Sequence, residues 1–269
     1  MSGCGCDGFV DSDGGFVGGA DDGGGGNPNC CGTLAMSIWD TPATPNANDE
    51  EFDTGSSLAA AWATSEGAIS ATAIDPYAGF AAGDSRISVN TRRASWYMVQ
   101  PQSGQTLAIS KLFVPSATYA AWFRGSFSHR TTAAINNDQT LGLILTENPY
   151  DTADRLEIFL NESDAAVIQV EFQQVVGGVV TSIGTTANKA ANDQTVFEGC
   201  LIQRTAANTY HGWALTNNGS ALFVGTTTTF TPTIGRIGLK AICASVAAPG
   251  NMIVGFDFLR VVDGAVFLP

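Results

Sequence analysis

Histidine is the scarcest reactive residue in this sequence. The 269 residues include only His129 and His211, so a metal site built from three histidines is excluded by count. No G-x-S-x-G motif is present, so a serine hydrolase relay lacks the strained turn that carries its nucleophile. We therefore expect both histidines to be surface residues rather than ligands or catalytic bases.

Positive charge is also scarce. Lysine and arginine together number 12 against 25 acidic residues, and the formal net charge is −13. A nucleic-acid surface or an anionic membrane surface needs clustered Lys and Arg. The only basic pair is Arg92-Arg93, which we interpret as a solvated strand end. The composition argues against nucleic-acid partners and indicates a soluble, acidic protein.

Long apolar runs are missing as well. No stretch approaches the roughly 20 apolar residues that span a bilayer, so we expect no membrane insertion. The beginning, Met1-Ser2-Gly3-Cys4, is polar and glycine-rich, and no secretory signal peptide is expected there. A virion component made in a host cytoplasm would have this pattern, and so would a plain cytosolic protein.

Helical periodicity is nearly absent, which favours an all-β fold over a parallel α/β fold. The one short helix candidate is 57–63. Strands are predicted wherever apolar and polar residues alternate between turn signals. These ranges are 67–74, 86–89, 95–99, 105–113, 120–128, 141–146, 195–204, 209–216, 221–226, 236–245 and 252–262, with three more inside 155–183.

The stretch 155–183 predicts three consecutive antiparallel strands with one buried and one wet face. Ile168, Val170 and Phe172 alternate with polar residues at a period of two. The first turn is predicted at 161–164, where the residues readily bond their own backbone. Gly177-Gly178 predicts a two-residue hairpin, and a second hairpin is predicted at Asn217-Asn218-Gly219.

Residues 1–33 differ from the rest of the chain. They are rich in Gly and Asp, hold Cys4, Cys6, Cys30 and Cys31, and have too few apolar residues for a core. They could be a flexible arm, or an arm closed by disulfides or by a four-thiolate metal site. Because C-x-C and C-C lack the usual C-x-x-C spacing, disulfides are favoured over metal, and no cofactor is predicted. Residues 34–48 are predicted to be a proline-containing linker and 49–269 a single β-sandwich.

Three stretches resemble a known family. Asp49-Glu50-Glu51-Phe52-Asp53, with Leu58 and Trp62, resembles the entry of concanavalin A-like, or laminin-G-like, lectin sandwiches. The stretch 255–262 resembles their closing strand, and 209–223 is similar to a late hairpin of that fold. The resemblance implies an antiparallel jelly-roll sandwich. In tailed bacteriophages such domains recur behind glycine-rich arms in tail, fibre and capsid-surface proteins, so it also implies a virion protein.

The same fold includes laminarinase-like glycoside hydrolases, whose catalytic glutamates follow the pattern E-x-D-x-x-E. Glu157 and Glu162 have this spacing, but Phe159 replaces the middle Asp. A five-residue offset puts two side chains on opposite faces of a regular strand unless a bulge intervenes. We therefore interpret Glu157 as part of a wet strand face and Glu162 as part of a turn, and expect no enzyme activity.

Exposed aromatic rings could stack on sugars, although most aromatic residues of a sandwich belong to its core. The candidates for carbohydrate binding are Trp96, Tyr97, Tyr210 and Trp213. Trp96 and Tyr97 are adjacent on a strand, so one of them should be exposed or covered by a partner, a pattern that suits a protein buried in an assembly. Cys200 and Cys243 are expected to be reduced core thiols rather than a disulfide.

The sequence favours a non-enzymatic structural component of a tailed-phage virion. It would be displayed on tail or capsid, anchored to other virion proteins by the N-terminal arm, homo-oligomeric, and able to contact host-surface glycans. The alternative is a carbohydrate-binding module of a cell-surface protein. A polysaccharide-degrading enzyme is a weaker alternative.

Overall fold

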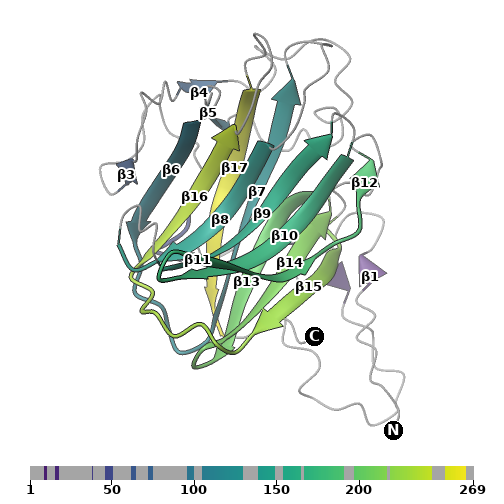
Figure 1. Cartoon of the computed structure of the whole chain (residues 1–269). Helices are drawn as coiled ribbons and strands as arrows, with labels where there is room; N and C mark the ends of the chain where they lie inside the picture. The colour runs from purple at the N-terminus through teal and green to yellow at the C-terminus, as the bar shows by residue number, and fades with distance from the viewer. Residues whose placement is uncertain are drawn as a thin grey trace, which may run out of the picture.

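The structure is a computed structural model. It describes residues 9–10, 16–17, 38, 46–50, 62–64, 72–74, 96–99, 105–129, 139–148, 154–164, 167–190, 197–216, 219–243 and 252–264. Most of these residues belong to two antiparallel sheets that pack face to face (Figure 1). The prediction of an all-β antiparallel sandwich is confirmed.

The first sheet has eight strands in the order β11-β10-β9-β8-β16-β6-β3, with β12 also paired to β10. Its strands are β3 (Ala63–Thr64), β6 (Gln105–Leu112), β8 (Gln139–Thr146), β9 (Arg155–Asp164), β10 (Val167–Val176), β11 (Val179–Thr185), β12 (Lys189–Ala190) and β16 (Arg236–Cys243).

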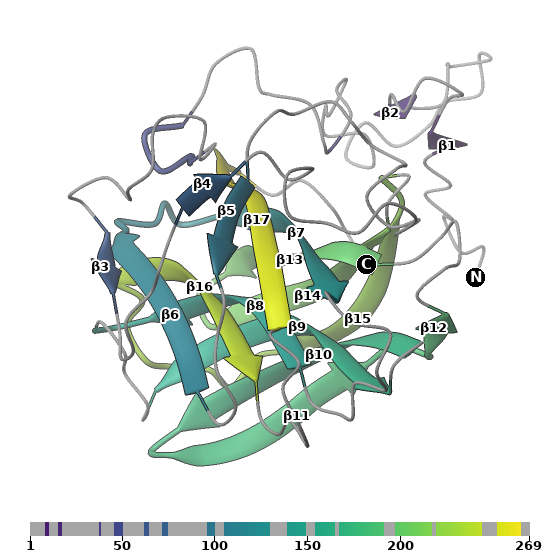
Figure 2. The ribbon, with the colours of Figure 1, turned by 90° about the horizontal axis from the view of Figure 1, so that it is seen from above.

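The second sheet has seven strands in the order β15-β14-β13-β7-β17-β5-β4. They are β4 (Thr72–Ile74), β5 (Trp96–Val99), β7 (Tyr119–His129), β13 (Phe197–Ala206), β14 (Thr209–Thr216), β15 (Ala221–Thr227) and β17 (Met252–Asp263). Viewed from above, the two sheets curve around a shared interior (Figure 2).

The central three-stranded meander is confirmed as β9, β10 and β11, but its first turn was placed too early. The four residues 161–164 belong to β9, and Asp164 pairs with Val167, so the predicted turn residues are part of the strand. Cross-strand pairing on both sides of β9 overrides the turn preference of these polar residues. Gly177 and Gly178 have φ of +59° and +79°, which supplies the backbone that the second hairpin requires.

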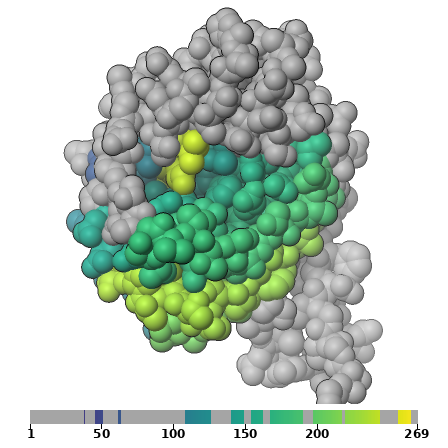
Figure 3. Space-filling model, viewed as in Figure 1, coloured from purple at the N-terminus to yellow at the C-terminus, as the bar shows by residue number. Residues whose placement is uncertain are grey.

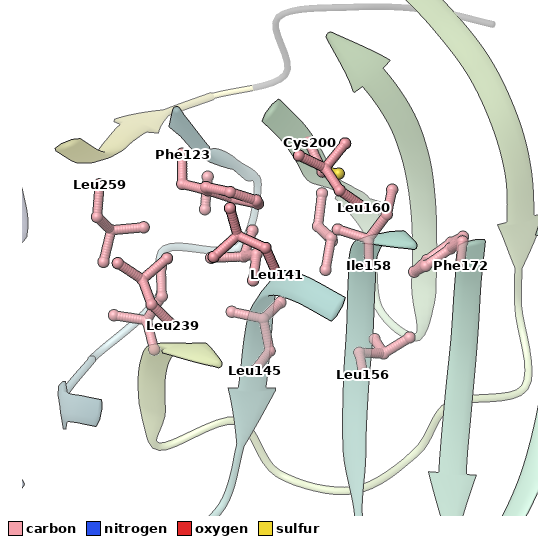
Figure 4. Close-up of a cluster of buried hydrophobic side chains, with 14 of the residues drawn as sticks. Phe123, Leu141, Leu145, Leu156, Ile158, Leu160, Phe172, Cys200, Leu239 and Leu259 are labelled. Carbon is pink, nitrogen blue, oxygen red and sulfur yellow. The ribbon is translucent and has the colours of Figure 1, made fainter. Parts of the chain in front are cut away.

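The interior between the sheets is apolar because alternate residues of each strand face inward. Figure 4 shows how residues from both sheets meet: Leu141, Leu156, Ile158 and Phe172 from the first, and Phe123, Cys200 and Leu259 from the second. Phe172 is fully buried, and its ring lies against Gly212, where an added Cβ would come within 2.6 Å of the ring.

The outer face of the seven-stranded sheet is also largely buried. Ile38, Trp122, Trp213, Leu215 and Phe258 belong to a second apolar cluster there. Trp122 donates its indole N–H to the carbonyl of Ile38 at 3.0 Å, so a residue preceding the sandwich lies on this face.

The start and end of the sandwich meet. Glu50 and Leu259 exchange two backbone hydrogen bonds of 2.8 Å, and the backbone of Val261 donates to Asp49 Oδ1 at 2.7 Å. Lys111 reaches the carbonyl of Asp49, and Trp62 donates to Glu50 Oε2 at 2.9 Å. The predicted entry segment therefore lies beside the closing strand.

In the arm, β1 (Phe9–Val10) and β2 (Phe16–Val17) pair antiparallel as a separate two-stranded ladder. These four residues are the larger apolar residues of 1–33. They are Phe and Val, which are residue types enriched in strands. The helix predicted at 57–63 and the strand at 86–89 lie mostly or wholly outside the described residues. The arm, linker and sandwich boundaries stay predictions.

Candidate functional site

The outer face of the eight-stranded sheet carries a polar band at its centre. Leu156, Ile158 and Leu160 face the core, so the residues between them on β9 face outward. The same alternation turns polar residues of β10 and one lysine of β16 to this side. We name the set the polar face: Arg155, Glu157, Asn161, Gln169, Glu171, Gln173 and Lys240.

Small residues line the neighbouring part of the same face. Ala108 and Ser110 of β6, Gly238 of β16 and Gly142 of β8 occupy its outward positions. A Cβ at Gly238 would approach the carbonyl oxygen of Ile109 to 2.2 Å, so glycine permits close strand packing there. The space-filling view shows a hollow on this side of the molecule (Figure 3).

Glu157 is the centre of the polar face. Its Oε1 accepts hydrogen bonds from Arg155 Nε at 3.0 Å and Gln173 Nε2 at 2.7 Å, and its Oε2 accepts one from Lys240 Nζ. Its side chain is 1% exposed. Burial alone raises the pKa of Glu157, but the positive charges of Lys240 and Arg155 together with the hydrogen bonds lower it below the ordinary value. Glu157 is therefore an ion-paired carboxylate, and the expectation of a wet position is wrong.

A second hydrogen-bonded group lies on the neighbouring positions. Asn161 Nδ2 donates to Glu171 Oε1 at 2.6 Å, and Gln169 Nε2 donates to the same oxygen at 3.0 Å. These three side chains are partly exposed. Because they hold one another in place, they can offer oriented amide and carboxylate groups to a ligand with little loss of side-chain entropy.

Phe159 is the aromatic residue of this face. It lies between Glu157 and Asn161 on β9 and is 9% exposed. Gly142 is its partner on β8, where a Cβ would come within 2.5 Å of the Phe159 Cβ. The Lys240 ammonium lies 6.0 Å from the ring centroid. An apolar ring thus adjoins the ion-paired and amide groups.

The register of β9 separates Glu157 from Glu162. The ladders to β8 and β10 run without a shift from Arg155 to Glu162, and the bulge falls beyond Glu162. The two glutamates therefore occupy positions of opposite parity, as a five-residue offset predicts. A retaining glycosidase needs its two carboxyls about 5–5.5 Å apart on one side of the sugar, and this register does not provide that arrangement.

Two of the four aromatic candidates are buried on opposite faces of β14. Tyr210 packs in the interior with its ring 5.8 Å from that of Phe230, and Trp213 packs on the outer face 5.2 Å from Phe223. They do not form one exposed platform. The side chains of Trp96 and Tyr97 on β5 lie outside the described residues. Sugar binding by any of the four stays a prediction.

His211 is buried, which corrects the expectation of a surface histidine. Its ring nitrogens lie 2.7 Å from Thr226 Oγ1 and 2.9 Å from Thr205 Oγ1, and burial lowers its pKa. Thr205 on β13 and Thr226 on β15, the two strands that flank β14, satisfy the ring, and no local sequence pattern predicts these partners. The side chain of His129 lies outside the described residues.

Cys200 is a buried free thiol of the core, as expected, and burial raises its pKa well above the ordinary value. Cys243 ends β16, and its side chain is outside the described part of the chain. Cys4, Cys6, Cys30 and Cys31 also lie outside it, so the choice between disulfides, metal and free thiols in the arm stays open.

The seven-stranded sheet holds buried charges that sequence reasoning missed. Arg124 donates from Nε and Nη2 to Glu198 Oε2 at 3.1 and 2.8 Å, and its Nη1 lies 3.6 Å from Asp257 Oδ2. All three residues are less than a tenth exposed. The sequence signal for this group was the presence of charged residues inside otherwise apolar strands. The three residues can be buried because they pair with one another.

Within the described residues, no group of three or more His, Cys, Asp or Glu side chains could hold a metal ion. In that same part of the chain, no helix has the length and hydropathy of a membrane span.

No model of a known protein family matches this sequence, and no curated protein matches it either. Similar solved structures do exist. The carbohydrate recognition domain of Emp47p has a TM-score of 0.52 and 10% identity, with 80% of this chain and 94% of that chain covered. A protein of unknown function from Shewanella oneidensis MR-1 has a TM-score of 0.52 and 14% identity, with 82% and 87% covered.

The GH43 protein BlXynB from Bacillus licheniformis has a TM-score of 0.51 and 12% identity over 85% of this chain. The chain spans 42% of the length of that protein. At such identities the likeness concerns the fold alone. Together with the two sheets described above, it confirms the predicted concanavalin A-like sandwich.

Proposed function

We propose that this protein is a non-enzymatic, carbohydrate-binding β-sandwich that binds glycans on the polar face. The observation that carries the proposal is the pre-positioned group Asn161, Gln169 and Glu171 beside Phe159 and the small-residue hollow. Amide and carboxylate groups can form paired hydrogen bonds with neighbouring sugar hydroxyls, and an adjoining apolar surface suits the C–H face of a sugar ring. The carbohydrate recognition domain among the structures of similar fold agrees with this assignment.

Two features support binding rather than hydrolysis. Glu157 is held as a carboxylate by two cations, so it is poorly suited to be the proton donor that glycoside hydrolysis requires. The register of β9 also places Glu162 at a position of opposite parity to Glu157, so the two carboxyls do not face the same side of the strand.

The proposal extends to the biological setting. On the family resemblance of the sequence, the protein is a structural component of a tailed-phage particle, attached to other virion proteins by residues 1–33 and exposing its sandwich to host-surface glycans. The alternative setting is a carbohydrate-binding module at a cell surface.

A glycan array followed by calorimetry on the best ligand tests the proposed site. Glu171→Ala removes the acceptor shared by Asn161 and Gln169, and should weaken binding at least about tenfold, or 1.4 kcal/mol. Glu147→Ala is the matched control, because Glu147 is an exposed carboxylate at the end of β8. Equal affinity for both variants would move the binding site elsewhere.

Hydrolysis is tested separately by reducing-sugar release from β-glucans and bacterial capsules. No release is expected. Release that Glu157→Gln stops would show that the protein is an enzyme and overturn the proposal.

A further inference from the structure

We propose that β11 is a self-association edge, at which a second copy of this chain adds its own β11 to extend the eight-stranded sheet. The two strands would run antiparallel about a two-fold axis. This inference concerns the rim of the sheet rather than the polar face, and it does not depend on glycan binding.

β11 lies at the end of its sheet and, among the described strands, pairs with β10 alone. Every residue from 176 to 182 is exposed, including Val179 at 67% and Val180 at 57%. Figure 2 shows β11 along the outer rim of the molecule. The first half of the strand therefore offers backbone donors and acceptors to an incoming strand.

Charge and proline do not protect the edge of β11, and its one bulge, at Ile183, lies beyond the exposed stretch 176–182. Natural edges are blunted by lysines, prolines or inward-pointing charges. The sequence from 173 to 188 contains none of Asp, Glu, Lys, Arg or Pro, and β11 itself reads V-V-T-S-I-G-T. This composition favours strand pairing.

The neighbouring edge has the same character. A Cβ on Gly184 of β11 would come within 2.1 Å of the carbonyl oxygen of Val224 on β15, so the edges of the two sheets lie against each other. The sequence from 205 to 235, which includes β15, also contains no Asp, Glu, Lys or Arg. Neither β11 nor β15 therefore contributes a charged side chain to this side of the sandwich. The carboxylate of Asp154 lies at the tip of the β10–β11 hairpin, where it accepts a hydrogen bond from the backbone N–H of Gly177 at 2.6 Å.

Charge identifies a second copy as the partner that this side suits. Each chain has a net charge of −13, so two copies repel wherever acidic surfaces meet. Because β11 itself carries no charge, two copies of this strand can approach without a carboxylate of one strand opposing the other. A two-fold axis brings each strand against its own equivalent and makes the pairing antiparallel, as an isologous interface requires.

Sedimentation velocity of the full chain over a concentration series tests the inference. A monomer–dimer equilibrium is expected, and its dissociation constant should fall as NaCl is added, because salt screens the repulsion between the chains. Val180→Lys places two lysines near the two-fold axis and should raise the dissociation constant at least about tenfold.

Val114→Lys is the matched control. Val114 is 90% exposed and lies just beyond the end of β6, near the edge of the sheet that is opposite β11. The substitution changes the net charge by the same amount as Val180→Lys. Circular dichroism should show both variants folded. A chain that stays monomeric at every soluble concentration, or a dimer that both lysine variants weaken equally or neither weakens, would overturn the inference.

Discussion

Glu157 shows how a charged side chain can be buried on the outer side of a sheet. Three donors surround its carboxylate: Arg155 from its own strand, Gln173 from β10 and Lys240 from β16. Coulombic attraction to two cations offsets the loss of hydration that would otherwise neutralise the carboxylate. The residue therefore joins three strands of the sheet through one ionised group.

Glu157→Gln should lower the free energy of unfolding at pH 7 by about 2–3 kcal/mol, because it leaves Lys240 beside an uncharged amide. Denaturant unfolding measures this change. Glu147→Gln, at an exposed carboxylate, should stay within about 0.5 kcal/mol of the wild type. Equal effects at both positions would mean that the ion pairs contribute nothing specific.

The same residue predicts a pH dependence. Its pKa is lower in the folded state than the ordinary 4.5, so its stabilising contribution is complete above that value and is lost as the pH falls through the folded pKa. As the pH is lowered from 5, the free energy of unfolding of the wild type should fall more steeply than that of Glu157→Gln. Parallel stability curves for the two proteins would contradict this prediction.

Phe172 represents the interior at the same scale. Phe172→Ala should destabilise the protein by about 3–5 kcal/mol, because the ring is fully buried between the sheets. Thermal or denaturant unfolding measures this, with the exposed Val114→Ala as control. A melting curve equal to that of the wild type would refute the packing of β10.

Alternation along single strands was enough to predict which residues face inward, as the burial of Ile168, Val170 and Phe172 confirms. It could not predict partners. Lys240 lies 83 positions from Glu157 in the sequence, and only the pairing of β8 with both β9 and β16 brings them together. The polar face was missed for this reason, while the aromatic candidates were chosen without knowing which surfaces other strands cover.

Among the elements, the β10–β11 hairpin was predicted most closely from the sequence. Two adjacent glycines between valine pairs specify a backbone with positive φ at both positions, and the structure has it. The β9–β10 turn was misplaced because polar residues that tolerate turns also fit the outer positions of a strand. Local sequence specifies a turn reliably where it demands an unusual backbone, and less so where it only permits one.

Gly177 gives the test at this scale. Its φ of +59° is one that Asn adopts readily, whereas a β-branched residue does not, and an added Cβ would meet no other atom within 4 Å. Gly177→Val should therefore cost about 1–2 kcal/mol in unfolding free energy, and Gly177→Asn well under 1. Similar stabilities for the two variants would mean that the turn does not hold this conformation in solution.

At the scale of the whole molecule, the class of fold followed from the sequence but the order of strands did not. β16 lies between β8 and β6, and β17 between β7 and β5, through connections that cross long stretches of chain. No local pattern encodes such neighbours. The hydrophobic alternation of each strand requires a second sheet to cover it, and this requirement is what made the sandwich predictable.

The arm is tested on the whole molecule as well. On the proposed virion role, deleting residues 1–33 should leave a soluble sandwich with the circular dichroism of the full chain but unable to enter phage particles. Quantitative mass spectrometry of purified particles measures the incorporation. Full occupancy by the truncated protein would show that the arm does not anchor it.

The hydrogen bonds between Glu50 and Leu259 have a consequence for how such a sandwich can be combined with other proteins. Because the first described residues of the sandwich pair with its last strand, both connections to the rest of a polypeptide leave from one place. The unit can then be spliced into a surface loop of a host domain without stretching that loop apart. A recombining genome could move it as a single cassette, with the host domain keeping its own fold.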